Sequence, residues 1–195
     1  MSLWEDQGPF GRDFGSHDNA TSPQFIGGSI DFDGGDHLHY SGTILPTTTN
    51  FTLAVRFNPR VLTAGVHEIV AQYSGSSSNY YILRINNGAP LLAVSGTSIQ
   101  SPSTIPLDTD CTLVTVRSGS NWALRVNGTQ VSSGSNGGSI FAAGVVLGAS
   151  SGTSGQWDAG WARYFNGTIK RVGVWSGALA GADLTTIEDW ASNGG

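Results

Sequence analysis

The sequence is poor in cysteine. Cys111 is the single cysteine among 195 residues, so no disulfide can form within the chain. Secreted eukaryotic domains of comparable type often carry paired cysteines, so we expect a protein that folds inside a cell. Cys111 precedes the apolar run TLVTV, which predicts a small buried hydrophobic residue.

Charge is also scarce. Charged residues make up 12% of the chain and the net charge is −5, against a usual charged share of roughly 25%. Without a basic stripe, binding to nucleic acid or to an anionic membrane surface is not expected. The chain shows no apolar run of transmembrane length, and its N-terminus lacks the charged and apolar regions of a signal peptide.

Glycine and aromatic residues are plentiful, with 28 Gly, 6 Trp and 8 Phe. Short alternating segments lie between turn dipeptides. The clearest is residues 51–57, in which every second residue is Phe, Leu or Val. Residues 122–126 lead into Asn127-Gly128, a strong hairpin signal. About ten such strands predict an all-β, two-sheet antiparallel jelly-roll sandwich in one domain.

The first and last strands of this sandwich can be identified from the sequence. Residues 29–40 and 169–175 both read as strands, and we expect the first and last strands to pair and to close one sheet. A short helix is predicted after Asp183, because Leu184, Ile187 and Ala191 recur at helical spacing. We expect this helix to cover one end of the sandwich.

Residues 1–25 form a different kind of segment. They show neither strand nor helix periodicity, and they contain several Gly and Pro residues, so we predict an extended N-terminal arm before a domain at 26–195. Two readings of its aromatic residues stay open. The rings either pack on the chain's own sandwich or anchor the arm on a partner protein. The candidates are Trp4, Phe10, Phe14 and Phe25.

An ordered set of motifs resembles the laminin-G-like jelly roll of the concanavalin A-like lectin/glucanase superfamily. The motifs are Phe32-Asp33-Gly34, Asn50-Phe51-Thr52-Leu53, the hairpin at 122–128, Leu147-Gly148 and the closing run at 167–175. They cover about residues 27 to 190 in the family's order. The resemblance implies a lectin-like sandwich with a short terminal helix, and it leaves the arm unexplained.

The same resemblance raises the question of calcium. Some members hold a structural calcium through carboxylates at sheet ends, and Asp31, Asp33, Asp36 and Asp158 are the weak candidate ligands here. Against this, Lys170 stands where the family pattern has an acidic residue. The alternative is that these aspartates serve turns, so no cofactor is expected. His37 and His39 lie on one face of a predicted strand and could bind a metal ion, but the sequence shows no third ligand. An exposed polar face is the preferred interpretation.

One aromatic segment is the candidate carbohydrate-binding site. Aromatic rings can stack on a sugar while charged groups bind its hydroxyls. The alternative is that these rings only cover the sandwich edge. The residues are Trp157, Asp158, Trp161, Arg163 and Tyr164.

Catalysis is not expected. Jelly-roll glycosidases need two carboxylates across a cleft, and Glu5, Glu68 and Glu188 do not form the E-x-D-x-x-E run of that enzyme branch. No G-x-S-x-G elbow occurs. Four N-x-[ST] sequons are interpreted as turns, at Asn19, Asn50, Asn127 and Asn166.

The chain also resembles the lectin-like domains that bacteriophages use as capsid decoration or tail-appendage proteins. That resemblance implies a non-enzymatic virion protein that folds in the host cytoplasm. Its arm would bind other virion proteins or copies of itself, and its sandwich loops would face outwards. The alternative is a free carbohydrate-binding module or adhesin domain, extracellular and bound to a cell-surface glycan.

Overall fold

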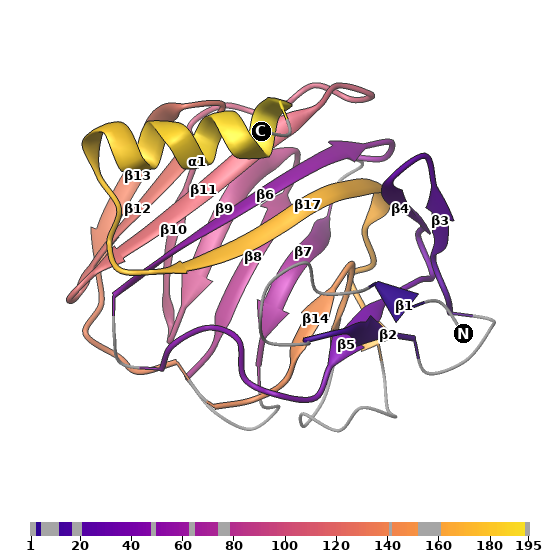
Figure 1. Cartoon of the computed structure of the whole chain (residues 1–195), viewed down its shortest axis with the longest axis horizontal. Helices are drawn as coiled ribbons and strands as arrows, with labels where there is room; N and C mark the ends of the chain where they lie inside the picture. The colour runs from indigo at the N-terminus through magenta and orange to yellow at the C-terminus, as the bar shows by residue number, and fades with distance from the viewer. Residues whose placement is uncertain are drawn as a thin grey trace.

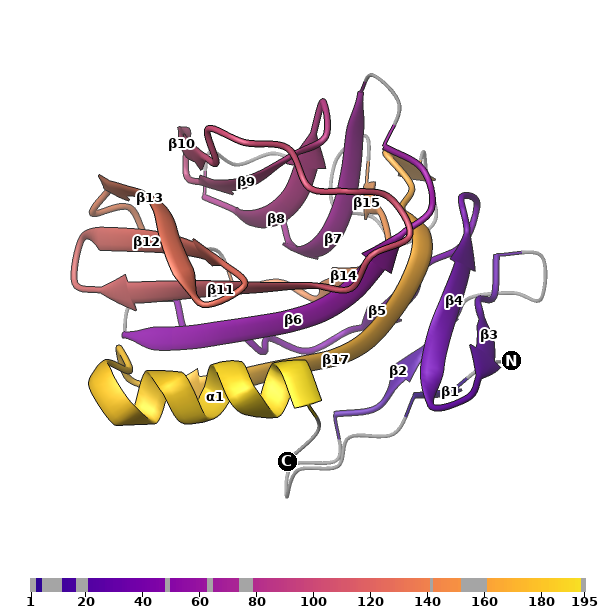
Figure 2. The same ribbon diagram turned by 90° about the horizontal axis from the view of Figure 1, so that it is seen from above.

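Two antiparallel sheets and one helix form three layers (Figures 1 and 2). The structure is a computed structural model that describes residues 3–4, 12–16, 21–47, 50–62, 65–73, 79–140, 142–151 and 161–193. Viewed from above, helix α1 (Gly181–Asn193) lies along one outer side of the sandwich, and the strands from β7 (Val66–Gln72) to β10 (Thr97–Gln100) lie on the opposite side (Figure 2). The predicted all-β jelly-roll sandwich is confirmed.

Sheet A is the eight-stranded sheet, with the order β1-β2-β5-β14-β7-β8-β9-β10. Its strands are β1 (Leu3–Trp4), β2 (Phe14–Gly15), β5 (Leu38–Tyr40), β14 (Val145–Leu147), β7 (Val66–Gln72), β8 (Tyr81–Asn86), β9 (Ala89–Val94) and β10 (Thr97–Gln100). Sequence patterns did not predict β10, which the Ser95-Gly96 turn joins to β9.

Sheet B is the seven-stranded sheet, with the order β13-β12-β11-β6-β17-β4-β3. Its strands are β13 (Thr129–Ser135), β12 (Asn121–Val126), β11 (Cys111–Ser118), β6 (Phe51–Pro59), β17 (Asn166–Ser176), β4 (Ser29–Asp33) and β3 (Gln24–Ile26). A separate two-strand ribbon pairs β15 (Ser150–Ser151) with β16 (Trp161–Ala162).

The predicted closure of the sheet by its first and last long strands is confirmed. Ile30 of β4 pairs with Ile169 of β17, and β17 continues along β6 to Ser176. The register shifts between Ile169 and Arg171, so Lys170 is the extra residue of a bulge. Gly167 is needed beside this point because a Cβ there would lie 2.2 Å from the carbonyl oxygen of Asn58.

The main core lies between the sheets and follows the predicted alternation. In β6, Phe51, Leu53, Val55 and Phe57 all belong to the core cluster. The rings of Phe51 and Trp122 meet edge to face, with centroids 5.7 Å apart. Cys111 is buried as predicted, and burial raises the pKa of its thiol to about 12, so the thiol is inert at neutral pH.

Helix α1 (Gly181–Asn193) packs on the face of sheet B that points away from the core. The prediction that it covers one end of the sandwich was therefore wrong. Its apolar residues contact outward-facing side chains of β6, β11 and β17. The rings of Trp175 and Trp190 meet edge to face, with centroids 5.1 Å apart. Arg171 donates to the Trp190 carbonyl at 2.8 Å, which satisfies the end of the helix. No helix among the described residues is long and apolar enough to span a membrane.

Part of the N-terminal segment belongs to the sheets. Phe14 of β2 is 9% exposed and lies in the main core against Tyr40. Phe25 of β3, in contrast, is 65% exposed beside the exposed Ile26. For Phe14, the structure therefore shows the first of the two alternatives, packing on the chain's own sandwich. The side chain of Trp4 and all of Phe10 lie outside the described residues.

Three of the four sequon asparagines are described, and each uses its amide within the fold. Asn50 Oδ1 accepts from the Gly119 amide at 2.7 Å, and Asn127 Oδ1 accepts from the Thr112 amide at 2.8 Å. Asn166 Nδ2 donates to the Asp33 carbonyl at 2.6 Å. These bonds tie loops to distant strands, in agreement with a structural role for the asparagines.

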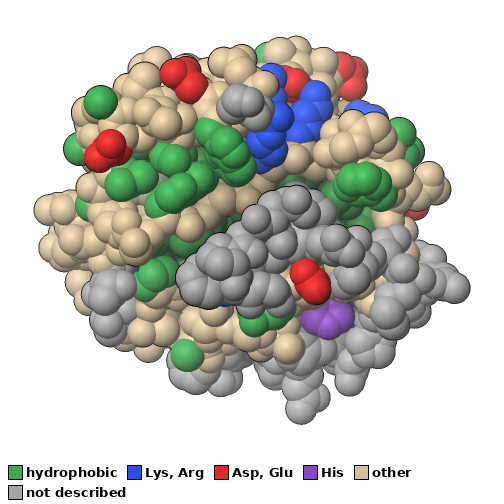
Figure 3. All heavy atoms as spheres, in the orientation of Figure 1, with side chains coloured by type: hydrophobic (Ala, Val, Ile, Leu, Met, Phe, Trp, Pro, Cys, Tyr) green, Lys and Arg blue, Asp and Glu red, His purple; other side chains and the backbone are tan. Residues whose placement is uncertain are grey.

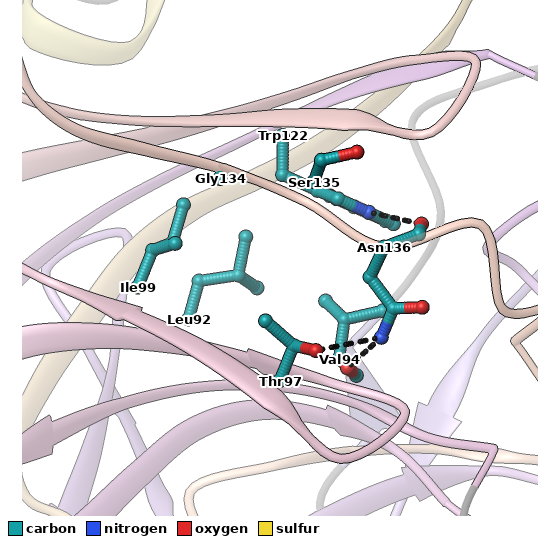
Figure 4. Close-up of a pocket in the computed structure, with 8 residues that line it drawn as sticks. All are labelled: Leu92, Val94, Thr97, Ile99, Trp122, Gly134, Ser135 and Asn136. Carbon is teal, nitrogen blue, oxygen red and sulfur yellow. Dashed lines mark hydrogen bonds between the residues drawn. The ribbon is translucent and has the colours of Figure 1, made fainter.

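A small cavity lies where β10 and β13 bring the two sheets together (Figure 4). Its volume of about 10 Å³ leaves room for about one water molecule. Asn136 closes one side by donating to the Val94 carbonyl and the Thr97 hydroxyl (Figure 4). This cavity is a packing gap and cannot hold a sugar. Its lining residues are Leu92, Val94, Thr97, Ile99, Trp122, Gly134, Ser135 and Asn136.

Candidate functional site

The first residues of β7 hold the segment that leads from β16 into β17. The Glu68 amide donates to the Arg163 carbonyl at 2.9 Å. His67 Nδ1 contacts the Tyr164 carbonyl at 3.1 Å, and the Phe165 amide donates to the Gly148 carbonyl at 2.8 Å. The base of the β15–β16 ribbon is therefore fixed to sheet A.

The side chain of Glu68 is the centre of a charged cluster at this point. Glu68 is fully buried, and its Oε1 accepts from Arg163 Nη1 at 3.1 Å. Arg84 Nη1 lies 3.8 Å from the same oxygen. Ser150 lies beside the carboxylate, but no described donor reaches Oε2 with hydrogen-bond geometry. We call Glu68, Arg84, Ser150 and Arg163 the Glu68 cluster.

Burial controls the acidity of Glu68. Removal from water raises the pKa of its carboxyl group, while Ser150, Arg163 and Arg84 partly oppose this by favouring the ionised form. The net direction is upwards. A buried carboxylate with a displaced pKa and specific charged partners is typical of functional sites, although structural ion pairs produce it too.

The backbone of Arg163 adds a second unusual feature. Its φ is +59°, in the left-handed region that a long side chain rarely adopts. Such a conformation costs on the order of 1–3 kcal/mol and tends to occur at binding and catalytic sites. The Arg163 side chain is 51% exposed. The strained backbone thus presents one guanidinium group both to the buried Glu68 and to solvent.

The Glu68 cluster shares its face of sheet A with a small apolar cluster. Glu68 pairs with Arg84, and Arg84 pairs with Leu91 on the next strand, so these side chains point to the same side. That side faces away from the main core, and it also carries Ala71, Ile82, Leu91 and Ala93. Tyr80 packs against this group, and its ring contacts Tyr73 with centroids 6.0 Å apart.

The structure brings two of the five predicted carbohydrate-binding residues to this site, Arg163 and Tyr164. Trp161 lies in β16 opposite Ser151, but its side chain is not described. Trp157 and Asp158 lie outside the described residues. In the sequence, Glu68 begins a predicted strand and is one of three glutamates that form no catalytic run, and its burial was not predicted. The available signal was a lone carboxylate at the start of the strand EIVAQ, where burial would require a cation.

The candidate calcium ligands are used in other ways. Asp31 pairs with Arg60 through both of its oxygens. Asp33 Oδ1 accepts from the Gly35 amide at 2.7 Å, and Asp36 Oδ2 accepts from the Asp33 amide at 2.8 Å. Within the described ranges, no group of three or more His, Cys, Asp or Glu residues could hold a metal ion. Asp33 and Asp36 serve the turn, and Asp158 lies outside the described residues.

The histidine pair was predicted to lie on an exposed polar face, and this was wrong for His37. Its side chain is 1% exposed, and its ring stacks with that of His39 at a centroid distance of 6.3 Å. The His37 amide donates to the Thr21 carbonyl, which ties the N-terminal segment to the turn before β5 and draws this residue inwards.

Lys170 has a clear role on the outer face of sheet B. Its Nζ lies 2.7 Å from Asp110, which also accepts from Arg56 at 2.8 Å and from Asn58 at 3.2 Å. Burial would raise the pKa of Asp110, but these donors outweigh it and the pKa is lowered. Lys and Arg side chains gather near the C-terminal end of α1, next to a band of hydrophobic side chains (Figure 3).

Layers, strand order and terminal helix together define a lectin-like jelly-roll sandwich. The family description of the concanavalin A-like lectin/glucanases superfamily, in its laminin G form, matches residues 32–185. The chain belongs to this superfamily.

Solved structures with similar folds come from several kinds of protein. A heptameric pentraxin from Limulus polyphemus is 22% identical, with a TM-score of 0.62 over 91% of this chain and 79% of that one. Domain 4 of AbnA, an extracellular arabinanase from Geobacillus stearothermophilus solved with arabinotriose, is 15% identical, with a TM-score of 0.63 over 96% and 82%. The mouse laminin α1 domains LG4-5 are 14% identical, with a TM-score of 0.62 over 82% and 45%. A search of curated proteins gave no match.

Proposed function

We propose that the protein is a non-enzymatic carbohydrate-binding module whose binding site lies at the Glu68 cluster. The observation that carries this is the fixing of Arg163, which has a strained backbone and a half-exposed guanidinium, to a buried carboxylate. A pre-organised polar group that solvent can reach is one requirement of sugar recognition. Two further points support it: membership of a lectin-containing superfamily, and a similar domain solved with arabinotriose.

The surroundings of Glu68 favour binding over hydrolysis. Glycoside hydrolysis by the common route uses two carboxyl groups, one of which acts as a general acid. The charged groups that act on Glu68 are two arginines. Among the described residues, the groups that act on Glu68 include no second carboxyl group, which supports binding over hydrolysis.

A glycan array probed with the full chain tests this proposal. We expect selective binding that Trp157→Ala and Trp161→Ala abolish, with Trp4→Ala as the matched control. A folded protein that binds no glycan, or whose binding both tryptophan variants retain, would contradict the proposal.

A second candidate, a virion decoration or tail-appendage role, is favoured by one observation. Phe25 and Ile26 are 65% and 54% exposed on the outermost strand of sheet B, and exposed apolar pairs at a sheet edge suit a protein interface. In this proposal the N-terminal segment binds other virion proteins or further copies of the chain, and the protein resides in the virion; the carbohydrate-binding proposal is compatible with an extracellular location.

The experiment for this candidate must avoid the core. Deletion of residues 1–24 would also remove Phe14 from the core, so a double substitution Phe25→Ser with Ile26→Ser is the sharper variant. We expect it to fold and to lose incorporation into particles, measured by co-sedimentation. Normal incorporation of the folded variant would exclude anchoring through β3.

A further inference from the structure

The Glu68 cluster holds more positive than negative charge. Two guanidinium groups face one carboxylate, so with Glu68 ionised the cluster has a net charge of +1. The whole chain, in contrast, carries −5. Arg84 Nε is buried and has no hydrogen-bond partner among the described residues. Among the residues that the structure describes, one cation at this site is therefore not neutralised.

The exposed member of the cluster is the one that a ligand can reach. The Arg163 side chain is 51% exposed, whereas that of Arg84 is 20% exposed and lies on the neighbouring strand. A guanidinium has five N–H donors in a planar fork that matches carboxylate or sulfate oxygens. Arg163 uses Nη1 for Glu68, so an anion can approach its solvent-facing edge.

We propose that this site selects acidic sugars, and that Arg163 binds a carboxylate or sulfate group on the glycan while Glu68 holds Arg163 in place. This inference rests on the proposed carbohydrate-binding function and specifies its ligand class. Glu68 acts as a positioning residue that also reduces the positive charge available to the ligand. Removal of the Glu68 charge is therefore expected to strengthen binding of an acidic sugar, although it breaks an ion pair within the protein.

The raised pKa of Glu68 predicts that the affinity for an acidic sugar depends on pH. The charged groups that face Glu68 are Arg84 of β8 and Arg163, and His67 precedes it on β7. The raised pKa of Glu68 means that its negative charge is lost above the usual range for a glutamate. Affinity for a sulfated sugar, whose charge does not titrate, should rise as the pH falls through the raised pKa of Glu68.

The test compares three trisaccharide probes by calorimetry at low and high salt: a galacturonate, a sulfated galactose oligomer and a neutral galactose oligomer. We expect the two acidic probes to bind about tenfold more tightly than the neutral one. Arg163→Gln should remove that preference, whereas Arg125→Gln, which breaks an ion pair with Glu188 on α1, should leave it. Glu68→Gln should raise acidic-probe affinity by about threefold and flatten its pH dependence.

The outcomes separate the two levels of the proposal. If the neutral probe binds as tightly as the acidic ones, or if Arg163→Gln keeps the preference, the acidic-sugar inference is overturned and the carbohydrate-binding function stands. If no probe and no arrayed glycan binds, the proposed function fails and takes the inference with it. Binding of inorganic sulfate as tight as that of the sulfated sugar also overturns the inference. Should Glu68→Gln not fold, Arg163→Gln and the salt dependence decide alone.

Discussion

Asp110 and Glu68 are both carboxylates that face basic side chains, yet their surroundings differ. Asp110 is partly exposed on the outer face of sheet B and accepts from three donors, which lower its pKa. Glu68 is fully buried in sheet A, one of its oxygens has no described hydrogen-bond donor, and its pKa is raised. The first arrangement is typical of groups that stabilise a fold, whereas the second occurs both at functional sites and in structural ion pairs.

The neighbours of the two carboxylates follow the same division. Beside Asp110, α1 covers the sheet and the rings of Trp175 and Trp190 fill the interface. Beside Glu68, Arg163 has a left-handed backbone and a half-exposed side chain. We therefore expect changes on the α1 face to affect stability, and changes at the Glu68 cluster to affect ligand binding.

The largest expected effect is on the α1 face. Trp190→Ala removes the ring that contacts Trp175 and should lower the free energy of unfolding by about 3 kcal/mol. Urea titration measures this, with the exposed Asp189→Ala as the matched control. The folded variant should bind sugar with unchanged affinity. A loss of stability below about 1 kcal/mol would mean that α1 contributes little to the fold.

The next effect concerns Asp110. Asp110→Asn weakens its bonds to Arg56 and Lys170 and should cost about 2 kcal/mol at pH 7. Because the folded-state pKa of Asp110 is lowered, its contribution is fully present above the unfolded-state pKa. The contribution is lost as the pH falls through the folded-state pKa. The difference between variant and wild type in urea unfolding should therefore shrink in acid. A difference independent of pH would show that the carboxylate charge is not responsible.

The charge of Glu68 should have a smaller effect on stability, and its pH dependence should be opposite to that of Asp110. Since its pKa is raised in the folded state, ionisation of Glu68 costs stability, and the wild type gains stability as the pH falls through the folded-state pKa. Glu68→Gln should change stability by about 1 kcal/mol at pH 7, because lost desolvation cost and lost ion pairing nearly cancel. The free energy of unfolding of the wild type, relative to that of the variant, should then increase as the pH falls. Thermal unfolding at several pH values measures this difference. A fall would contradict the raised pKa.

The smallest effect is expected at β3. Phe25→Ser should change stability by less than about 0.5 kcal/mol, because the ring is mostly exposed. Phe14→Ser is the contrasting variant and should cost about 3 kcal/mol, because that ring lies in the core. Thermal unfolding compares the two. Equal losses would mean that both rings support the sandwich.

The fold was largely predictable because its signals are local. The alternation in β6, the Asn127-Gly128 turn and the closing strand each depend on neighbours in the sequence. The short strands β2 and β10 were missed because long-range pairing, not intrinsic pattern, makes them strands. The position of α1 was missed since periodicity shows that a helix has an apolar face but not what that face covers.

The candidate site was less predictable. Arg163 and Tyr164 were named for their residue types, which is a local observation. Glu68 comes within reach of Arg163 only because the β15–β16 ribbon returns beside β7, across 95 residues of sequence. The burial of His37 likewise accompanies a contact between separate segments, the bond from its amide to the Thr21 carbonyl. Contacts of this kind are set by the fold and carry no signature in either segment alone.

The central claim is that recognition takes place at the Glu68 cluster and not on the α1 face. Amide chemical-shift mapping of the isotopically labelled protein during titration with trigalacturonate tests it most directly. We predict that the largest shifts fall at Glu68, Arg84 and residues 163–165, while the amides of α1 stay unchanged. Shifts concentrated on α1 and β17, or no shifts at saturating ligand, would contradict the account.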